Sequence, residues 1–393
     1  MSFLYAAVRT PFGRYNGGLS NIRTDDLACS VMEAQLARLP GLDPARIDEV
    51  VWGNANGAGE DNRNVGRMAA LLAGIPVSVP ATTVNRLCGS SLDAAIIGSR
   101  AIDTGEADVI LAGGVESMTR SPWVIPKPSK GYPAGDVTAV STTLGWRLVN
   151  PRMPDRWTVS LGEANELLQH KFGIDRGRQD AFAARSHALA HRAWEDGFYD
   201  DLVAPVAGAA LARDEAIRPD TSVERLASLK PSFRPDGTIT AGNASPLSDG
   251  AAAVVLGSEA AAGLLGCEPL ARIAGRASVA VEPQMFGYAP VEAAERALAR
   301  AGVGWPDVGA VELNEAFAVQ SLACIDSWPV DPEIVNCAGG AIAIGHPLGA
   351  SGARILATLA KVLRTRQQRW GVAAICIGVG QGLAVVLENT ATN

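Results

Sequence analysis

Two cysteines, a histidine and an asparagine lie in short turns between expected strands and helices, where their side chains could act on a bound molecule. Cys88 follows an expected strand and precedes the expected helix of residues 92–102. Backbone N–H groups and the dipole at a helix N-terminus favour a thiolate, so Cys88 is a candidate nucleophile. A lone cysteine at such a place can equally be a small buried hydrophobe.

The other three candidates lie in the C-terminal third of the chain. His346 lies in the glycine-rich loop of residues 339–352, and Cys376 precedes the glycine-rich turn between two expected strands. Asn314 begins the string Asn-Glu-Ala-Phe. Each has a structural alternative: glycines that only form turns, a cysteine that fills a core and an asparagine that caps a helix.

The composition is typical of a well-packed globular enzyme. Hydrophobic residues make up 48% of the 393 residues and charged residues 19%, which argues against disorder and against a coiled coil. A net charge of -7 predicts no binding to nucleic acid or to an anionic membrane. The chain has no apolar run of about 18 residues, and no basic region precedes its first apolar run, so we expect neither a spanning helix nor a signal peptide.

The six cysteines are far apart and form no CxxC pair. This pattern favours free thiols in a reducing compartment, so we expect a cytoplasmic protein. His187 and His191 could share a helix face, but no third ligand accompanies them, and we therefore expect no metal site.

Alternating apolar strands and amphipathic helices predict an α/β fold in two halves. We expect the first half to comprise residues 1–118, completed by about 247–262, and the second half residues 263–393. Residues 119–246 are rich in Pro, Trp and charge, which predicts an inserted loop domain with a helix around 176–197. Each half contains a strand, a turn with a reactive residue and a helix, which suggests an internal duplication.

Four strings in this order resemble those of the thiolase superfamily, and the resemblance covers nearly the whole chain. They are NRLCGSS at 85–91, NEAF at 314–317, the loop at 335–354 that contains GGAIAIGHPLGASGAR, and CIGVGQG at 376–382. The resemblance implies a duplicated thiolase fold with two five-stranded mixed sheets, helices in an αβαβα arrangement and a loop domain. It also implies a homodimer or homotetramer.

The resemblance assigns a role to each candidate. Cys88, deprotonated by His346, would attack a 3-oxoacyl-CoA or acetyl-CoA and become an S-acyl enzyme. Cys376 would act as acid or base, for which the unperturbed thiol pKa of about 8.5 is suitable. His346 and a water held by Asn314 would form one oxyanion hole, and the N–H groups of Cys88 and Gly378 the other. Coenzyme A is a substrate in this scheme, and no cofactor is required.

A local basic patch is expected for the anionic CoA. The arginines and lysine of this patch are Arg213, Arg218, Arg225, Lys230 and Arg234. They precede residues 241–245, from Ala241 to Ser245, which resemble the thiolase segment that contacts the pantetheine arm. Arg218 and Ser245 match positions used for CoA in the family, whereas Arg225 stands where serine is common.

The sequence indicates the type of reaction more clearly than the acyl chain of the substrate. Leu161, Phe286 and Phe317 are expected to border the substrate; Phe286 stands where many short-chain enzymes have methionine. A general 3-ketoacyl-CoA thiolase of fatty-acid β-oxidation or an acetoacetyl-CoA thiolase is the main interpretation. The string GEDNRNV at 59–65 is similar to one in thiolases that cleave 3-oxoadipyl-CoA in aromatic degradation. The alternative is a subunit-interface or active-site-lining loop that several degradative subfamilies share.

Two rival interpretations come from other classes. A ketoacyl synthase would use a Cys-His-His set, and Asn314 and Cys376 occupy the positions that distinguish it. A non-catalytic CoA- or lipid-binding relative would not need the four intact catalytic positions.

Overall fold

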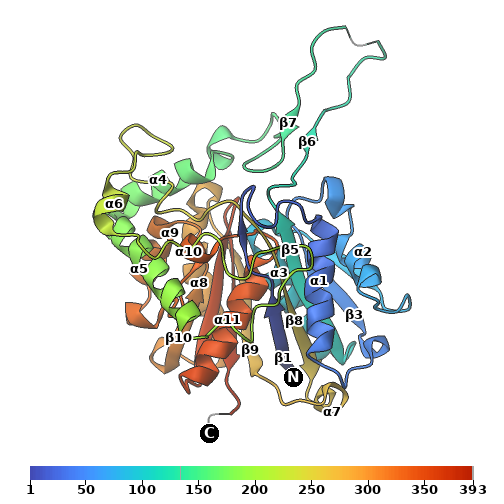
Figure 1. Cartoon of the computed structure of the whole chain (residues 1–393). Coiled ribbons are helices and arrows are strands. Elements are labelled where there is room, and N and C mark those ends of the chain that lie inside the picture. Colours follow the sequence, from blue (N-terminus) through green and yellow to red (C-terminus); the bar gives the residue numbers. More distant parts are fainter. Residues whose placement is uncertain (133, 392–393) are drawn as a thin grey trace.

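A computed structural model describes residues 1–132 and 134–391 (Figure 1). Within these residues, nine strands form one mixed sheet in the order β10-β11-β12-β9-β1-β8-β5-β3-β4, and a short tenth strand, β2, pairs with β8. The first-half strands are β1 (Ser2–Arg9), β2 (Gly13–Arg14), β3 (Glu49–Gly53), β4 (Ala81–Val84), β5 (Val109–Ser117) and β8 (Ser248–Ser258). The second-half strands are β9 (Ala271–Ala280), β10 (Val308–Leu313), β11 (Trp370–Ile377) and β12 (Gln381–Glu388).

The mixed α/β fold is confirmed, although the sheet count differs from the two five-stranded mixed sheets that we expected. The halves join edge to edge, because β1 and β9 pair through Phe3 with Arg272 and Leu4 with Ala271. Besides β2, five strands lie on the β1 side and only four on the β9 side. Where a fifth strand would extend the second half, Val335 forms a single parallel bridge to Val311.

Helices cover both faces of this sheet. The longer ones are α1 (Thr24–Ala37), α2 (Val65–Leu72), α3 (Ser90–Asp103), α8 (Ala289–Ala301), α9 (Ala318–Ile325) and α11 (Ser351–Thr365). The short helices α7 (Ala261–Leu265) and α10 (Ala341–Ile344) lie in connections. The short 3₁₀ turns are η1 (Pro44–Arg46), η2 (Gly59–Asp61), η3 (Leu87–Gly89), η4 (Asp155–Trp157), η5 (Pro283–Tyr288), η6 (Trp305–Asp307) and η7 (Pro332–Ile334).

The core has three parts. Successive side chains of a strand point to opposite faces of the sheet, so neighbouring residues of one strand belong to different parts of the core. In β5, Ile110 belongs to a central core with α3 and α11, whereas Val109 belongs to an outer core with α1. In β11, Ile375 belongs to the central core and Ala374 to a second outer core with α8. Helices α3 and α11 therefore lie between the two halves, as the layered arrangement requires (Figure 1).

The starts of these two central helices are in close contact. The backbone N–H of Ala353 donates to Ser91 Oγ at 2.9 Å. A Cβ at Gly352 would lie 2.2 Å from the backbone nitrogen of Leu92, so only glycine permits this approach. The contact brings the turn before α3 and the loop before α11 to the same region of the molecule.

The described part of the inserted segment, residues 119–246, contains a projecting hairpin and three helices (Figure 1). The hairpin pairs β6 (Trp123–Val124) with β7 (Val140–Ser141), and the helices are α4 (Leu161–Phe172), α5 (Arg176–Glu195) and α6 (Val223–Ala227). The helix expected around 176–197 is α5, whereas α4 was not expected. None of the helices in the described residues combines the length and apolar character needed to cross a bilayer.

Candidate active site

Cys88 lies in the turn η3, directly before α3, and its side chain is buried. Leu87 has a φ of 48°, a left-handed conformation that is uncommon for a residue with a branched side chain. The backbone N–H groups of Cys88 and Gly378 both donate toward the Cys88 sulfur. The turn therefore places a thiol against two N–H groups from opposite halves of the chain.

The helix start alone does not make Cys88 a thiolate. Burial raises the pKa of Cys88 to about 11, and the charge of Glu116 raises it further, although the two N–H groups lower it. The desolvation penalty outweighs the favourable helix start, because charge is costly in a dry site. The free enzyme holds a neutral thiol at Cys88 and needs a base.

Cys376 lies at the end of β11 and is fully buried. Burial raises its pKa well above the ordinary value, and the charge of Cys88 raises it further, so the two thiols share one site. The turn that follows has two left-handed residues, Val379 with φ 63° and Gly380 with φ 76°. A β-branched valine in this conformation stores strain, and the turn aims the Gly378 N–H at Cys88.

His346 is buried, and a hydrogen bond fixes its ring. Its Nδ1 lies 2.6 Å from Ser351 Oγ, and Ser351 donates its own proton to the carbonyl of Pro347 at 2.9 Å. Ser351 Oγ must therefore accept from Nδ1–H, which leaves the lone pair on Nε2. Burial, followed by the charge of Arg354, lowers the pKa of His346 to about 3, so the ring is neutral. In the described structure it forms no hydrogen bond with Cys88.

Both polar atoms of the Asn314 side-chain amide have a hydrogen-bond partner. Its Oδ1 accepts from Arg354 Nη2 at 3.1 Å, and its Nδ2 lies 3.4 Å from each ring nitrogen of His346. Arg354 is fully buried and lies 3.5 Å from Glu312. The amide thus turns its NH₂ toward His346, where it can hold a water or a substrate oxygen.

A cavity of about 80 Å³ opens beside Cys88. Leu161 and Gly378 line it, as do Trp146, Arg147 and Leu348. A Cβ at Gly378 would lie 2.8 Å from the Trp146 ring, so the indole limits the space at this position. Phe286 and Phe317 do not line this cavity. They belong to the buried cluster around Cys376.

Glu116 connects the loops that surround the cavity. Its carboxyl oxygens accept from the backbone N–H groups of Ala55 and Gly349 at 2.9 Å and of Asn56 at 3.1 Å. Burial raises the pKa of Glu116 to about 8. Through these bonds Glu116 holds the loop after β3 against the loop that carries His346.

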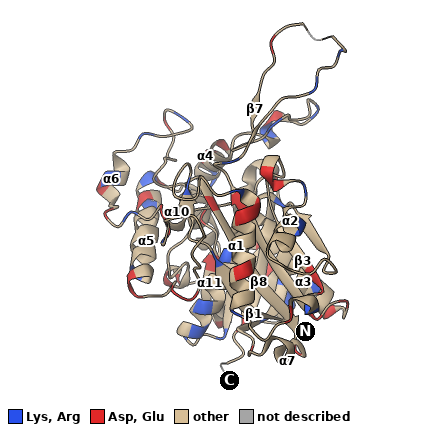
Figure 2. Ribbon diagram, turned by 45° about the vertical axis from the view of Figure 1, so that its right-hand side comes forward, with Lys and Arg blue, Asp and Glu red and all other residues tan. Residues whose placement is uncertain are grey.

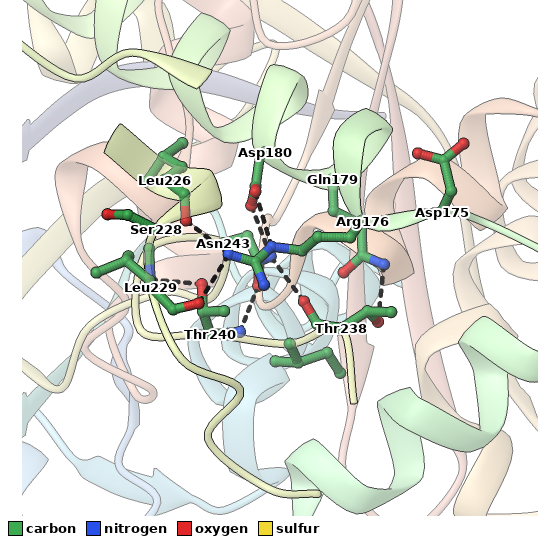
Figure 3. A network of polar contacts seen from close by, with 12 residues as sticks. Asp175, Arg176, Gln179, Asp180, Leu226, Ser228, Leu229, Thr238, Thr240 and Asn243 are labelled. Atoms are coloured by element: carbon green, nitrogen blue, oxygen red, sulfur yellow. Dashed lines mark hydrogen bonds and ion pairs between the residues drawn. The ribbon is translucent and has the colours of Figure 1, made fainter. Parts of the chain in front are cut away.

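The segment expected to contact pantetheine lies beside the Asn-Glu-Ala-Phe loop. Ser245 N–H donates to the carbonyl of Ala316 at 3.0 Å, and Ala244 pairs with Phe317. A polar network fixes the preceding turn to α5, since Asn243 Nδ2 donates to Asp180 Oδ1 at 3.0 Å (Figure 3). Ala241 is exposed next to this turn.

The expected basic patch is largely neutralised. Around α6 both signs of charge are interspersed (Figure 2). Arg213 pairs with Glu195, Arg225 with Asp220 and Arg234 with Glu163. Arg218 is exposed and forms no ion pair with the described residues; its backbone N–H donates to His187 Nδ1 at 3.2 Å. Of the two arginines assigned to CoA, Arg218 is the one whose guanidinium is not engaged by an acidic side chain.

Several site residues were missed from the sequence. Ser351 and Arg354 lie within the quoted glycine-rich string, so their spacing from His346 on a helix start could have indicated them. Trp146 and Arg147 come from the inserted segment, where no sequence pattern indicates that they line a site. Across residues 1–132 and 134–391, no group of three or more His, Cys, Asp or Glu side chains is placed to hold a metal ion.

Known proteins share this architecture and sequence. Residues 2–260 match the family model "Thiolase, N-terminal domain", and residues 267–389 match "Thiolase, C-terminal domain". Human mitochondrial 3-ketoacyl-CoA thiolase in complex with CoA superimposes with a TM-score of 0.93 at 38% identity, covering 99% of this chain and 98% of that one.

Two bacterial relatives are similar over their full length. The "3-oxoadipyl-CoA/3-oxo-5,6-dehydrosuberyl-CoA thiolase" of Escherichia coli (strain K12) is 46% identical, covering 98% of this chain and 99% of that protein. The "Beta-ketoadipyl-CoA thiolase" of Pseudomonas aeruginosa is 47% identical, covering 98% of both. The chain therefore belongs to the thiolase family.

Proposed function

We propose that this acyltransferase cleaves a 3-oxoacyl-CoA with coenzyme A through an S-acyl intermediate on Cys88. One observation carries the proposal: two buried thiols, Cys88 and Cys376, share a site in which two backbone N–H groups surround the Cys88 sulfur. A nucleophile and a second proton-transfer group are what a two-step acyl transfer needs.

In the first step the Cys88 sulfur attacks the 3-oxo carbon while its proton passes to Nε2 of His346. Hydrogen-bond donors of this buried site stabilise the negative charge that develops on the 3-oxo oxygen. The bond between C2 and C3 then breaks, and Cys376 protonates the acetyl-CoA carbanion that leaves. In the second step the thiol of coenzyme A gives its proton to the Cys376 thiolate and attacks the acyl group. Cys88 leaves and recovers its proton from His346.

The pKa values fit proton transfer during attack. Both partners are neutral before the reaction, since the pKa is about 11 for Cys88 and about 3 for His346. A free ion pair in this site would be unfavourable, so the proton must move as the carbon–sulfur bond forms. In this proposal the N–H groups of Cys88 and Gly378 and the amide of Asn314 offset the charge that develops then.

Mass spectrometry tests this proposal directly. After incubation with acetyl-CoA, the wild type should carry an acetyl group on Cys88, and Cys88→Ala should carry none and be inactive. Cys376→Ala should still be acylated but should not exchange the α-protons of acetyl-CoA in deuterated water. An unmodified Cys88 in the wild type would favour the non-catalytic binding protein, and turnover by Cys88→Ala would remove the central claim.

We further propose 3-oxoadipyl-CoA as the substrate, in place of a β-oxidation intermediate. Two observations support this: the relatives at 46% and 47% identity are thiolases named for 3-oxoadipyl-CoA and beta-ketoadipyl-CoA, and the string at 59–65 is similar to one in such enzymes. The cavity of about 80 Å³ is small compared with the several hundred Å³ of ordinary ligand pockets, which favours a short acyl chain. Thiolysis rates with acetoacetyl-, 3-oxoadipyl- and longer 3-oxoacyl-CoA test this, and a preference for the longest chains would contradict it.

The remaining expectations stay proposals. We propose that Arg218, Arg225, Ala241 and Ser245 contact CoA, and Arg218→Gln should raise KM for CoA more than it lowers kcat. An unchanged KM would count against that contact. We also propose a cytoplasmic homodimer or homotetramer, with residues 1–118 and 247–262, 119–246 and 263–393 as the structural units. Sedimentation of the purified chain would determine the subunit count.

A further inference from the structure

Arg147 lines the same cavity as Cys88. It follows the hairpin of the inserted segment, and its guanidinium reaches back to the loop after β3. Its Nη2 donates to the carbonyl of Asn56 at 2.8 Å and lies 3.4 Å from Asn56 Oδ1, and Nη1 lies 3.5 Å from the carbonyl of Thr142. These contacts fix the cation at the cavity wall.

All acceptors of Arg147 are neutral. Among the described residues no carboxylate lies within ion-pair distance of its guanidinium, in contrast to Arg213, Arg225 and Arg234. A guanidinium has five N–H donors, and the three contacts leave at least two of them without a partner in the described chain. A half-buried cation of this kind is poised to bind an anion.

Glu116 is the acidic residue of the cavity wall, but it does not neutralise Arg147. Both of its oxygens already accept backbone N–H groups, from Ala55, Asn56 and Gly349. Its charge also acts on Cys88, where it raises the pKa of the thiol. The cavity wall thus retains an unpaired positive charge.

The walls of the cavity differ in character. Leu87, Leu161 and Leu348 are apolar, whereas Asn56, Ser121 and Thr142 join Arg147 in lining it with polar groups. A short acyl chain on Cys88 would contact the apolar side chains. A negatively charged group at the end of that chain would be stabilised by Arg147 and by the polar side chains beside it.

We propose that Arg147 binds the terminal carboxylate of the acyl group that Cys88 carries, and so selects short dicarboxylic 3-oxoacyl-CoA substrates over neutral ones of equal length. This proposal rests on the proposed thiolase reaction and names the residue that determines its substrate class. The paired N–H groups of arginine match the two oxygens of a carboxylate, which a lysine cannot do as well.

Two substrates of equal chain length test the proposal. 3-Oxoadipyl-CoA ends in a carboxylate and 3-oxohexanoyl-CoA in a methyl group, so the ratio of their kcat/KM values isolates the terminal charge. For Arg147→Met the ratio should fall on the order of 10- to 100-fold, the usual effect of losing a charge-assisted hydrogen bond in a partly buried site. Arg147→Lys should retain part of the preference. Arg152→Met removes an exposed charge from the same segment and should keep the wild-type ratio.

The outcomes separate the two proposals. If the wild type prefers 3-oxoadipyl-CoA and Arg147→Met keeps that preference, Arg147 does not bind the carboxylate, while the proposed function stands. If the kcat/KM values for the two substrates fall equally in Arg147→Met, the residue only stabilises the loop that contains Asn56, and the proposal is overturned. If the wild type cleaves neither substrate, the proposed function itself fails. A lowered ratio with retained turnover of 3-oxohexanoyl-CoA supports the assignment.

Discussion

Ser351 Oγ lies 2.6 Å from Nδ1 of His346 and donates its own proton to the carbonyl of Pro347. The serine therefore accepts from the ring and fixes the tautomer in which Nε2 carries the lone pair. Ser351 begins α11, so the helix that packs against α3 also orients the base. A residue of the central layer thus determines which nitrogen can receive the Cys88 proton.

Ser351→Ala should slow acylation, because the ring would lose its fixed tautomer and orientation. We expect kcat/KM to fall by about 10- to 100-fold, less than the roughly 100- to 10,000-fold that a general base contributes as a whole, with little change in KM for CoA. Single-turnover release of acetyl-CoA measures the step. Ser30→Ala removes a similar serine-to-carbonyl hydrogen bond in α1 and serves as the control. An equal loss in both variants would mean that only helix stability had changed.

The reactivity of Cys88 should rise with pH far above neutrality. Burial raises its pKa to about 11, and His346, with a pKa of about 3, holds no proton to pair with a thiolate. Alkylation of Cys88 by iodoacetamide should therefore increase by about tenfold per pH unit from pH 7 to pH 10, because the thiolate reacts. Peptide mass spectrometry separates Cys88 from the other thiols. A plateau near pH 7 would indicate an ion pair instead.

The buried pair of Arg354 and Glu312 should matter for stability as well as for Asn314. Arg354→Met leaves Glu312 without its cation, and breaking the buried pair should cost about 3–5 kcal/mol above pH 8, where Glu312 is charged. For comparison, Arg178→Met breaks the exposed pair with Asp326 and should cost at most about 1 kcal/mol. Urea unfolding measures both. Similar losses would show that burial adds nothing to the Arg354 interaction.

The same variant should change the pH dependence of unfolding. Burial raises the pKa of Glu312 to about 8, from an unfolded value of 4.5, while Arg354 lowers it. A raised folded pKa gives stability that is present below pH 4.5 and is lost as pH rises through about 8. Without Arg354 the folded pKa of Glu312 should rise further, and the extra loss falls above pH 8. Arg354→Met should therefore be more destabilised at pH 9 than at pH 6. Adding Glu312→Gln should abolish this difference, and a remaining difference would assign it to another group.

The sequence was sufficient where reactive residues lie in local turns. Cys88 before α3, His346 before α11 and Cys376 before a hairpin turn are found where strand and helix patterns place them. The pKa of Cys88 could not be predicted in the same way. A helix start is visible in sequence, but the burial that outweighs it depends on packing between the halves.

The cavity wall shows a second limit of sequence. Trp146 and Arg147 lie in an irregular segment without periodicity, and they reach Cys88 only because the inserted segment folds back over the loop after β3. Phe286 was expected beside the substrate, and the structure places it in the outer core that also contains Cys376. Which side chains face a cavity is a tertiary property that strand and helix patterns do not contain.

The final prediction concerns Gly378, whose N–H donates toward the Cys88 sulfur. A Cβ at this position would lie 2.8 Å from the Trp146 ring and 3.4 Å from Leu161, so Gly378→Ala should push the turn away and cost about 1–3 kcal/mol through overpacking. Acylation of Cys88 should fall by about 100-fold, as for loss of one oxyanion donor. Trp146→Leu in the same chain makes room and should restore part of the rate, whereas Gly263→Ala, which meets no atom within 4 Å, should have no effect. If Trp146→Leu restores stability without acylation, the displaced N–H would not be the cause of the lost rate.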